Sequence, residues 1–130
     1  MSVRQIRELD MNGALGVSSQ QLMMPDGRQI ALDKDGYLRD LGDWDEAVAE
    51  ALAELAGLQL TASHWEIIDY VQDFYQQTGL SPATRPLVRL VAQRGGADKG
   101  KSIYLMKLFG GKPALTVSRL AGLPRPANCF

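Results

Sequence analysis

The order of hydrophobic and polar positions divides the chain into a short β segment and a longer helical segment. From Met23 onward, short apolar runs alternate with the turn sequences Pro25-Asp26-Gly27 and Asp35-Gly36. Glycine adopts the positive φ that such turns require, so the pattern predicts a small β-hairpin or meander. Residues 1–22 show no clear period, and we expect a loose N-terminal extension there.

Helical periodicity follows, with apolar positions three and four residues apart. Gly57 and Gly79 stand where helix C-terminal caps belong. Pro86 should kink the third helix or delay its start, because proline lacks a backbone N–H. The pattern predicts an α+β fold, in which the small β element packs on a mainly helical body with a helix–turn–helix-like part. The five predicted helices lie near residues 43–57, 61–79, 82–94, 102–109 and 113–121.

The last nine residues read GLPRPANCF. Pro124 and Pro126 exclude a helix, so we expect an extended, flexible arm that carries Cys129 as the penultimate residue. The chain is thus expected to consist of an extension (residues 1–22), one domain (residues 23–121) and the arm (residues 122–130).

Composition narrows the possible chemistry. The chain has 130 residues, one cysteine and one histidine, which excludes an internal disulfide and any His/Cys metal cluster. We therefore expect no metal and no cofactor. The N-terminal sequence contains no apolar block of the length of a signal peptide or a membrane span, so we expect a cytoplasmic protein with a reduced thiol.

The net charge of −1 hides a strong asymmetry. Residues 1–80 contain 14 acids and 5 bases, a net of −9, whereas residues 81–130 contain 9 bases and the single acid Asp98, a net of +8. Two explanations remain open at this point. Either the C-terminal part meets an anionic partner, or the two halves neutralise each other within the fold.

Two short motifs suggest other functions. The sequence Gly95-x-x-x-x-Gly100-Lys101-Ser102 satisfies the P-loop pattern, but a true P-loop needs a preceding strand and a carboxylate for Mg²⁺. Helical sequence precedes it here, so we interpret it as a solvated basic loop. His64 suggests acid–base chemistry, yet no second histidine or nucleophile accompanies it, and its position opens a helix.

Cys129 is the strongest candidate for chemistry, since nothing structural requires sulfur on a proline-rich tether. A free thiol has a pKa of about 8.5, so only a small fraction is thiolate at neutral pH without nearby cations. The alternative is an inert thiol. The candidate residues for binding an anion or a partner are Arg85, Lys101, Arg119 and Arg125.

Several stretches resemble the DsrC/TusE family from Met23 to the last residue, and the most specific is the pattern AGLPxPxxC at residues 121–129. The resemblance implies a small α+β fold whose penultimate cysteine, here Cys129, carries sulfur as a persulfide. The resembling stretches are DKDGYL (33–38), LTASHWEII (60–68), VQDFYQQTGLSPATRPLV (71–88), YLMKLFGGKPA (104–114) and RLAGLPRPANCF (119–130).

The resemblance also indicates a branch of the family. Members that act with sulfite reductase carry a second arm cysteine eleven residues earlier, where this chain has Ser118. A TusE-like sulfurtransferase is therefore implied, which accepts sulfur from a TusBCD-type complex and passes it to the tRNA thiouridylase MnmA. It would meet tRNA only indirectly and no membrane. The alternatives are a single-cysteine relative linked to sulfur oxidation or regulation, and a nucleic-acid-binding helix–turn–helix module.

Overall fold

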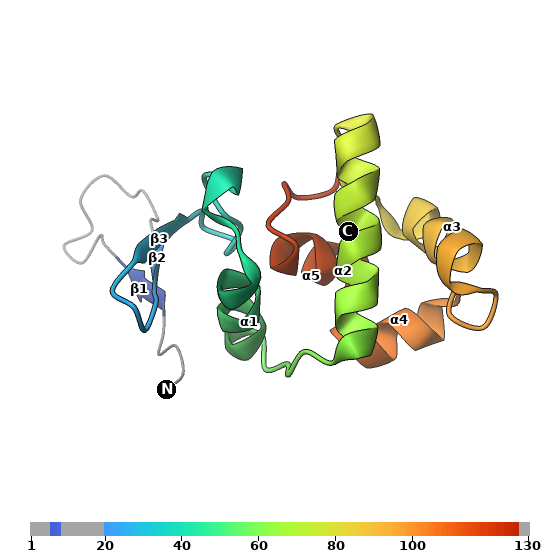
Figure 1. The fold of residues 1–130 in the computed structure, drawn as a ribbon, viewed down its shortest axis with the longest axis horizontal. Coiled ribbons are helices and arrows are strands. Elements are labelled where there is room, and N and C mark those ends of the chain that lie inside the picture. The colour runs from blue at the N-terminus through green and yellow to red at the C-terminus, as the bar shows by residue number, and fades with distance from the viewer. Residues whose placement is uncertain (1–5, 9–19, 128–130) are drawn as a thin grey trace. The chain divides into compact units, whose positions relative to one another are not determined.

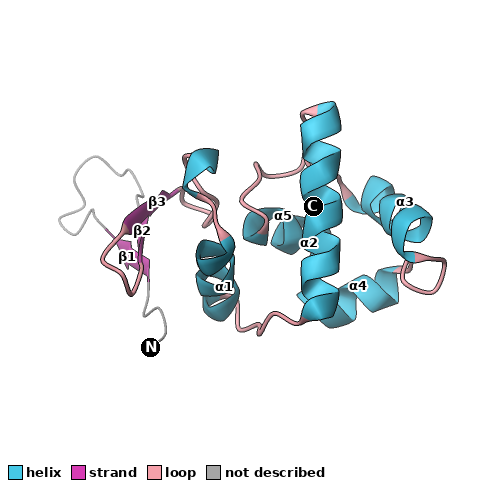
Figure 2. Ribbon diagram, viewed as in Figure 1, coloured by secondary structure: helices cyan, strands magenta, loops and turns pink. Residues whose placement is uncertain are grey.

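The computed structural model describes residues 6–8 and 20–127, which belong to two compact units (Figure 1). The first unit comprises residues 1–59 and contains the strands and one helix. The second comprises residues 60–130 and contains four helices (Figure 2).

The first unit contains a three-stranded antiparallel sheet in the order β1-β2-β3. Its strands are β1 (Ile6–Glu8), β2 (Gln20–Met23) and β3 (Gln29–Leu32). Leu22 pairs with Ile30 in the β2–β3 hairpin, and both side chains are buried. Gly27 adopts a φ of 98° in the connecting turn, as the Pro-Asp-Gly sequence predicts.

This sheet extends further toward the N-terminus than the predicted hairpin. β1 and most of β2 lie within residues 1–22, where we expected a loose extension. A three- or four-residue strand is too short to give a period that sequence reading can recognise. Residues 1–5 and 9–19 lie outside the described part of the chain.

The helix of the first unit, α1 (Glu46–Leu55), follows a short 3₁₀ helix at Leu41–Asp43. Asp45 caps α1, since its carboxylate accepts the Val48 backbone N–H at 2.9 Å. That hydrogen bond, followed by the Arg28 guanidinium 3.0 Å away, lowers the pKa of Asp45. The sequence pattern places the start of this helix near residue 43, but Asp43 belongs to the 3₁₀ helix.

The second unit is built around α2 (Ala62–Thr78), which contacts α3 (Thr84–Gly95), α4 (Ser102–Phe109) and α5 (Pro113–Leu120) (Figure 1). None of the described helices is long and apolar enough to cross a membrane. The core of this unit takes aliphatic and aromatic side chains from all four helices: Ile67, Ile68, Val71, Leu87, Val91, Leu105, Phe109, Val117 and Leu120.

The helix boundaries agree closely with the sequence pattern, and the α+β class with five helices is confirmed. Pro86 is the third residue of α3, where its missing N–H would have no partner within the helix. The helix accordingly begins at Thr84, which is the delayed start that Pro86 predicted. Gly79 ends α2 with a φ of 74°.

Candidate functional site

The arm leaves α5 through a tight hydrogen-bonded turn. The Gly122 N–H donates to the Arg119 carbonyl at 3.1 Å, and the Leu123 N–H donates to the Ser118 carbonyl at 2.9 Å. With Gly122 at a φ of 76° and Leu123 buried, these two bonds form a Schellman motif. The sequence Ala-Gly-Leu thus sets the direction in which the chain continues toward Cys129.

The first half of the arm is held against the helices. Gln72 of α2 donates from Nε2 to the Ala121 carbonyl at 3.0 Å, and the Ser81 hydroxyl donates to the Pro124 carbonyl at 2.6 Å. Pro126 is buried as well. The arm is therefore non-helical, as its prolines predict, but it is anchored up to this point rather than detached. Cys129 lies outside the described residues.

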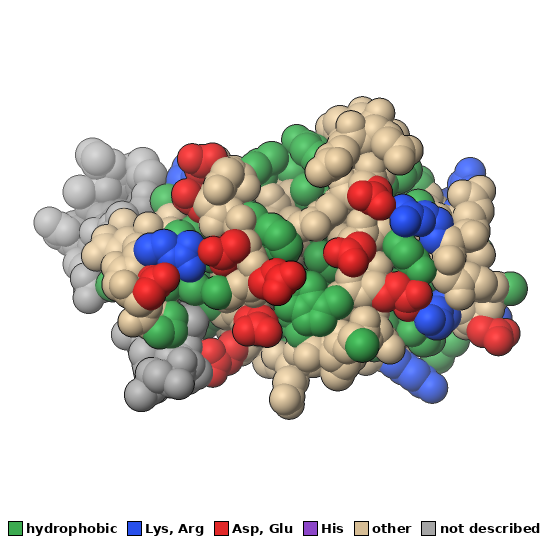
Figure 3. All heavy atoms as spheres, in the orientation of Figure 1, with side chains coloured by type: hydrophobic (Ala, Val, Ile, Leu, Met, Phe, Trp, Pro, Cys, Tyr) green, Lys and Arg blue, Asp and Glu red, His purple; other side chains and the backbone are tan. Residues whose placement is uncertain are grey.

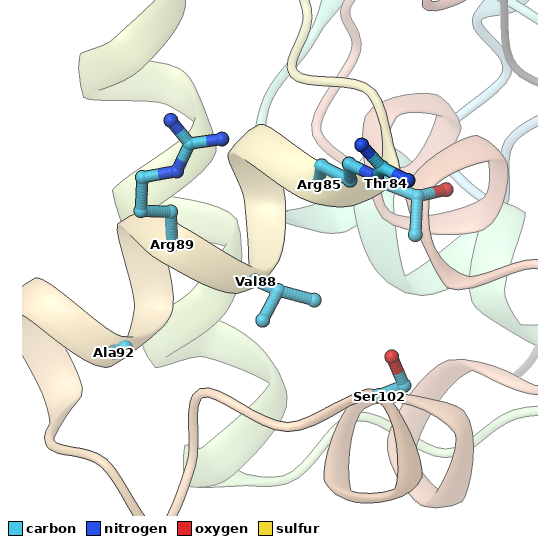
Figure 4. Close-up of a pocket in the computed structure, with 6 residues that line it drawn as sticks. All are labelled: Thr84, Arg85, Val88, Arg89, Ala92 and Ser102. Atoms are coloured by element: carbon cyan, nitrogen blue, oxygen red, sulfur yellow. The ribbon is translucent and has the colours of Figure 1, made fainter.

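The four candidate cations fall into two groups. Arg119, in the last turn of α5, and the exposed Arg125 stand on the segment that leads to Cys129. Arg85 instead lines a pocket of about 400 Å³ between α3 and α4, together with Ser102 (Figure 4). Lys101 is exposed and directly precedes Ser102.

The P-loop-like segment connects α3 to α4. Gly96 adopts a φ of 104°, and its carbonyl accepts the N–H groups of Lys99 and Gly100, each at 3.1 Å. A Cβ on Gly100 would lie 2.3 Å from the Cβ of Ala92 in α3. A helix precedes this segment where a P-loop requires a strand. The glycines therefore allow a tight turn between the two helices, which agrees with the interpretation of this segment as a solvated basic loop.

A network of charged groups fixes this loop to α2. Lys99 Nζ lies 2.8 Å from Glu66 Oε1, and the Tyr70 hydroxyl donates to Glu66 Oε2 at 2.7 Å. Arg94 pairs with Asp73 at 2.9 Å, and its guanidinium lies 4.7 Å from the centre of the Tyr70 ring. Figure 3 shows acidic side chains over α2 next to basic ones over α3 and the loop. Among the described residues, these contacts neutralise Lys99 and Arg94 within the fold.

Glu66 gives this network a defined pH dependence. Its hydrogen bonds to Lys99 and then to Tyr70 lower the pKa of Glu66 below its ordinary value of 4.5. A lowered pKa stabilises the fold above 4.5, and the contribution disappears as the pH falls through the folded-state pKa. We expect wild type to be modestly more stable than Glu66→Gln at neutral pH.

Urea unfolding of both proteins at successively lower pH checks this expectation. The difference in their free energies of unfolding should shrink only below pH 4.5. A difference that persists unchanged in strong acid contradicts the role of the Glu66 carboxylate.

His64 has a structural role. Its Nε2 lies 2.7 Å from the Leu108 carbonyl, which can only accept, so Nε2 carries the proton. Its Nδ1 then accepts the Thr61 backbone N–H at 3.0 Å and completes a capping box of α2. The ring packs edge-on against Phe109 at 5.2 Å. Both nitrogens are engaged, which leaves none for acid–base chemistry.

The comparison with known proteins settles the family. A family model described as "DsrC like protein" matches residues 24–130. The chain belongs to the DsrC-like family. Sulfurtransferase TusE of Pectobacterium atrosepticum is 49% identical over 105 residues, which cover 81% of this chain and 96% of that protein. The sulfurtransferase TusE homolog of Haemophilus influenzae is 49% identical over 104 residues, which cover 80% and 95%.

Solved DsrC structures have the same fold. The NMR structure of DsrC from Allochromatium vinosum matches with a TM-score of 0.75 and 41% identity, over 82% of this chain and 96% of that one. The crystal structure of the oxidized γ-subunit of dissimilatory sulfite reductase (DsrC) from Archaeoglobus fulgidus matches with a TM-score of 0.70 and 39% identity, over 80% and 95%. The family resemblance and the fold class expected from the sequence are confirmed.

In this DsrC-like chain, Ser118 stands where the resemblance implies a second arm cysteine in members that act with sulfite reductase. Ser118 is fully buried in α5, and its hydroxyl has no hydrogen-bond partner among the residues that the structure describes. A small buried site without a hydrogen-bond partner accommodates the thiol of a cysteine as readily as the hydroxyl of a serine. Serine supplies no second sulfur, so any sulfur chemistry of this chain depends on Cys129.

Sequence reading missed the residues that hold the arm and one cation of the pocket. Gln72 and Ser81 bond to backbone carbonyls 49 and 43 residues away, and no local pattern reports such partners. Arg89 lies four residues after Arg85, so the helical period of α3 would have placed both on one face. The four-residue spacing would therefore have identified Arg89 as a second cation beside Arg85.

Removing the Ser81 hydroxyl should loosen the arm. We expect Ser81→Ala to raise amide hydrogen exchange at Leu123 severalfold, because the Pro124 carbonyl loses its donor. Ser118→Ala is the matched control, since it removes a hydroxyl that makes no hydrogen bond. Equal exchange in the two variants would show that the Ser81 contact does not hold the arm.

Proposed function

We propose that this chain is a sulfurtransferase that carries sulfur as a persulfide on Cys129. It accepts the sulfur from a TusBCD-type donor complex and passes it to an MnmA-type tRNA thiouridylase. The observation that carries the proposal is the position of Cys129, the sole cysteine of the chain, after the anchored Ala-Gly-Leu-Pro segment. The chain is also 49% identical to a protein named sulfurtransferase TusE. The assignment of this chain to the sulfurtransferases agrees with the names of these relatives.

The chemistry consists of two thiol-exchange steps. The Cys129 thiolate attacks the outer sulfur of a persulfide on the donor, which forms the Cys129 persulfide and releases the donor's thiolate. A thiolate of the acceptor then attacks the outer sulfur on Cys129, which regenerates the Cys129 thiolate. Each step exchanges one S–S bond for another, so no external oxidant or reductant is needed.

Chain connectivity limits where the sulfur can go. In the sequence, Cys129 is two residues after Ala127, the last residue that the structure describes. The anchors at Ala121 and Pro124 hold the preceding segment against α2 and the residues after it. Arg125 is exposed four residues before the thiol, and we assign it, with Arg119, to attracting the anionic persulfide.

Intact mass spectrometry tests the proposal. Incubation with a cysteine desulfurase relay should add the mass of one sulfur to the wild-type chain, and a reductant should remove it. Cys129→Ser should gain no mass under the same conditions. The persulfide carrier is refuted if the two proteins behave alike.

Binding to RNA separates the proposal from the alternative of a nucleic-acid-binding module. A carrier meets tRNA only through the acceptor enzyme, so we expect no salt-dependent binding of bare tRNA. Tight, salt-dependent binding that is unchanged in Cys129→Ser would instead favour the binding module.

A further inference from the structure

The exposed face of α3 and the start of α4 form a second surface with its own chemistry. Arg85, Val88, Arg89 and Ala92 follow one another at helical spacing, so they lie along one side of α3. Figure 4 shows Val88 extending toward the first turn of α4 and the Ser102 hydroxyl directed back toward α3. We call the residues that line this pocket, together with Ile103 and Met106 of α4, the α3–α4 face: Thr84, Arg85, Val88, Arg89, Ala92, Ser102, Ile103 and Met106.

The two arginines of the α3–α4 face carry charge that the fold does not neutralise. Arg85 and Arg89 are exposed, and neither forms an ion pair with an acidic side chain in residues 20–127. By contrast, Arg94, at the end of the same helix, is paired with Asp73. The α3–α4 face therefore presents two guanidinium groups one helical turn apart, which suits carboxylates as partners.

Apolar side chains lie beside these charges. Val88 and Ala92 are half-buried in the pocket wall. On α4, Ile103 is 63% exposed and Met106 is 44% exposed, and Met106 lies one turn after Ser102. Exposed large aliphatic side chains on a helix that also contributes a residue to a pocket are typical of protein-binding sites.

The loop between α3 and α4 connects the two helices that line this pocket. Gly100 approaches Ala92 so closely that a Cβ there would overlap with the α3 backbone. Lys99 in turn is tied to Glu66 of α2. The wall of the α3–α4 face is thus fixed in place before any partner binds, which reduces the entropy lost on binding.

We propose that the α3–α4 face binds a segment of another protein that carries acidic side chains next to an aliphatic one. The carboxylates would pair with Arg85 and Arg89, and the aliphatic side chain would enter the pocket against Val88. This proposal goes beyond sulfur transfer, because it involves neither Cys129 nor the arm. The positive net charge of residues 81–130 left two explanations open. This proposal assigns one of them, an anionic partner, to the α3–α4 face.

A protein segment fits these observations better than a nucleic acid does. The bases of single-stranded nucleic acids stack on aromatic side chains of the proteins that bind them. None of the described residues that line this pocket is aromatic. Phosphate groups also gain nothing from an aliphatic wall, whereas an acidic, amphipathic peptide uses both the charges and the apolar surface.

Peptide selection on the full chain tests the proposal. A displayed library of random peptides is selected on wild type and in parallel on Arg85→Glu/Arg89→Glu. The matched control is Lys107→Glu/Lys112→Glu, which changes the net charge equally at exposed positions outside the pocket. We expect peptides rich in Asp or Glu beside Leu, Ile or Val, whose affinity falls about tenfold or more in the arginine variant alone.

Other outcomes overturn the proposal. Selected peptides without acidic enrichment, or equal affinity for both charge variants, would show that the α3–α4 face does not bind such a segment. Binding of a single-stranded RNA that is lost in Arg85→Glu/Arg89→Glu, with no peptide selected, would assign the face to nucleic acid. If Arg85→Glu/Arg89→Glu does not fold, the single variants Arg85→Gln and Arg89→Gln replace it, with an expected loss of severalfold each.

A separate measurement distinguishes this proposal from the proposed function. Inorganic polysulfide can supply sulfur directly, since the Cys129 thiolate attacks the terminal S–H sulfur of a hydropolysulfide, forms the Cys129 persulfide and releases a polysulfide one sulfur shorter. Arg85→Glu/Arg89→Glu should gain one sulfur atom from polysulfide as wild type does. Failure of that reaction in wild type would refute the carrier, and its success leaves the α3–α4 face to be judged by peptide binding alone.

Discussion

Replacing Cys129 by Ser should reduce tRNA thiolation in a reconstituted relay to the level found when the chain is omitted. The reason is chemical: a serine hydroxyl cannot form a persulfide, and the sequence contains no other thiol. The measurement is the yield of thiolated tRNA with the donor complex, the chain and the thiouridylase present together.

Cys129→Ala provides the control for this result, since it also lacks the sulfur but differs from Ser in polarity. The two variants should fail equally. Residual thiolation in the serine variant alone, or any thiolation above background in both, would mean that sulfur passes the relay without Cys129.

Replacing Gly100 by Ala should have the largest effect on stability. The added Cβ would lie 2.3 Å from the Ala92 Cβ, 2.5 Å from its Cα and 2.7 Å from its backbone N. Two of these atoms belong to the α3 backbone and cannot rotate away, so the loop or the helix must shift. We expect a loss of about 3 kcal/mol in the free energy of unfolding, measured with urea.

Gly111 is the matched control for that substitution. A Cβ at Gly111 would meet no atom within 4 Å, and its backbone is outside the left-handed region. Gly111→Ala should leave stability unchanged or raise it by about 0.5 kcal/mol, because alanine restricts the unfolded chain. Similar losses in both variants would contradict the close contact between the loop and α3.

The helical half of the fold could be predicted from the sequence because its signals are local. Gly79 and Pro113 mark helix ends by their own backbone preferences, and the expected bounds of α4 were those observed. Asp43 and Asp45 show the limit of such signals. Both have the side chain of a cap, and only the 3₁₀ helix that contains Asp43 decides between them.

The site was harder to predict, since its geometry depends on contacts distant in sequence. A glutamine on α2 and a serine after it carry no mark that they hold the arm, because their partners are backbone carbonyls. The AGLPxPxxC pattern predicts where the chemistry resides, and it does not indicate how the preceding segment is held. In the same way, the residue pattern of a P-loop is present, and the helix α3 before it shows that its glycines serve a turn between two helices.

The hydrogen bond between Ser81 and Pro124 has a kinetic consequence. Cys129 is five residues beyond Pro124 in the sequence, and five residues of fully extended chain span at most about 17 Å. On so short a tether, a thiol faces a docked partner at an effective concentration on the order of millimolar. Once a complex has formed, the exchange of sulfur should follow first-order kinetics. The concentration of the carrier would then govern only how often partners meet.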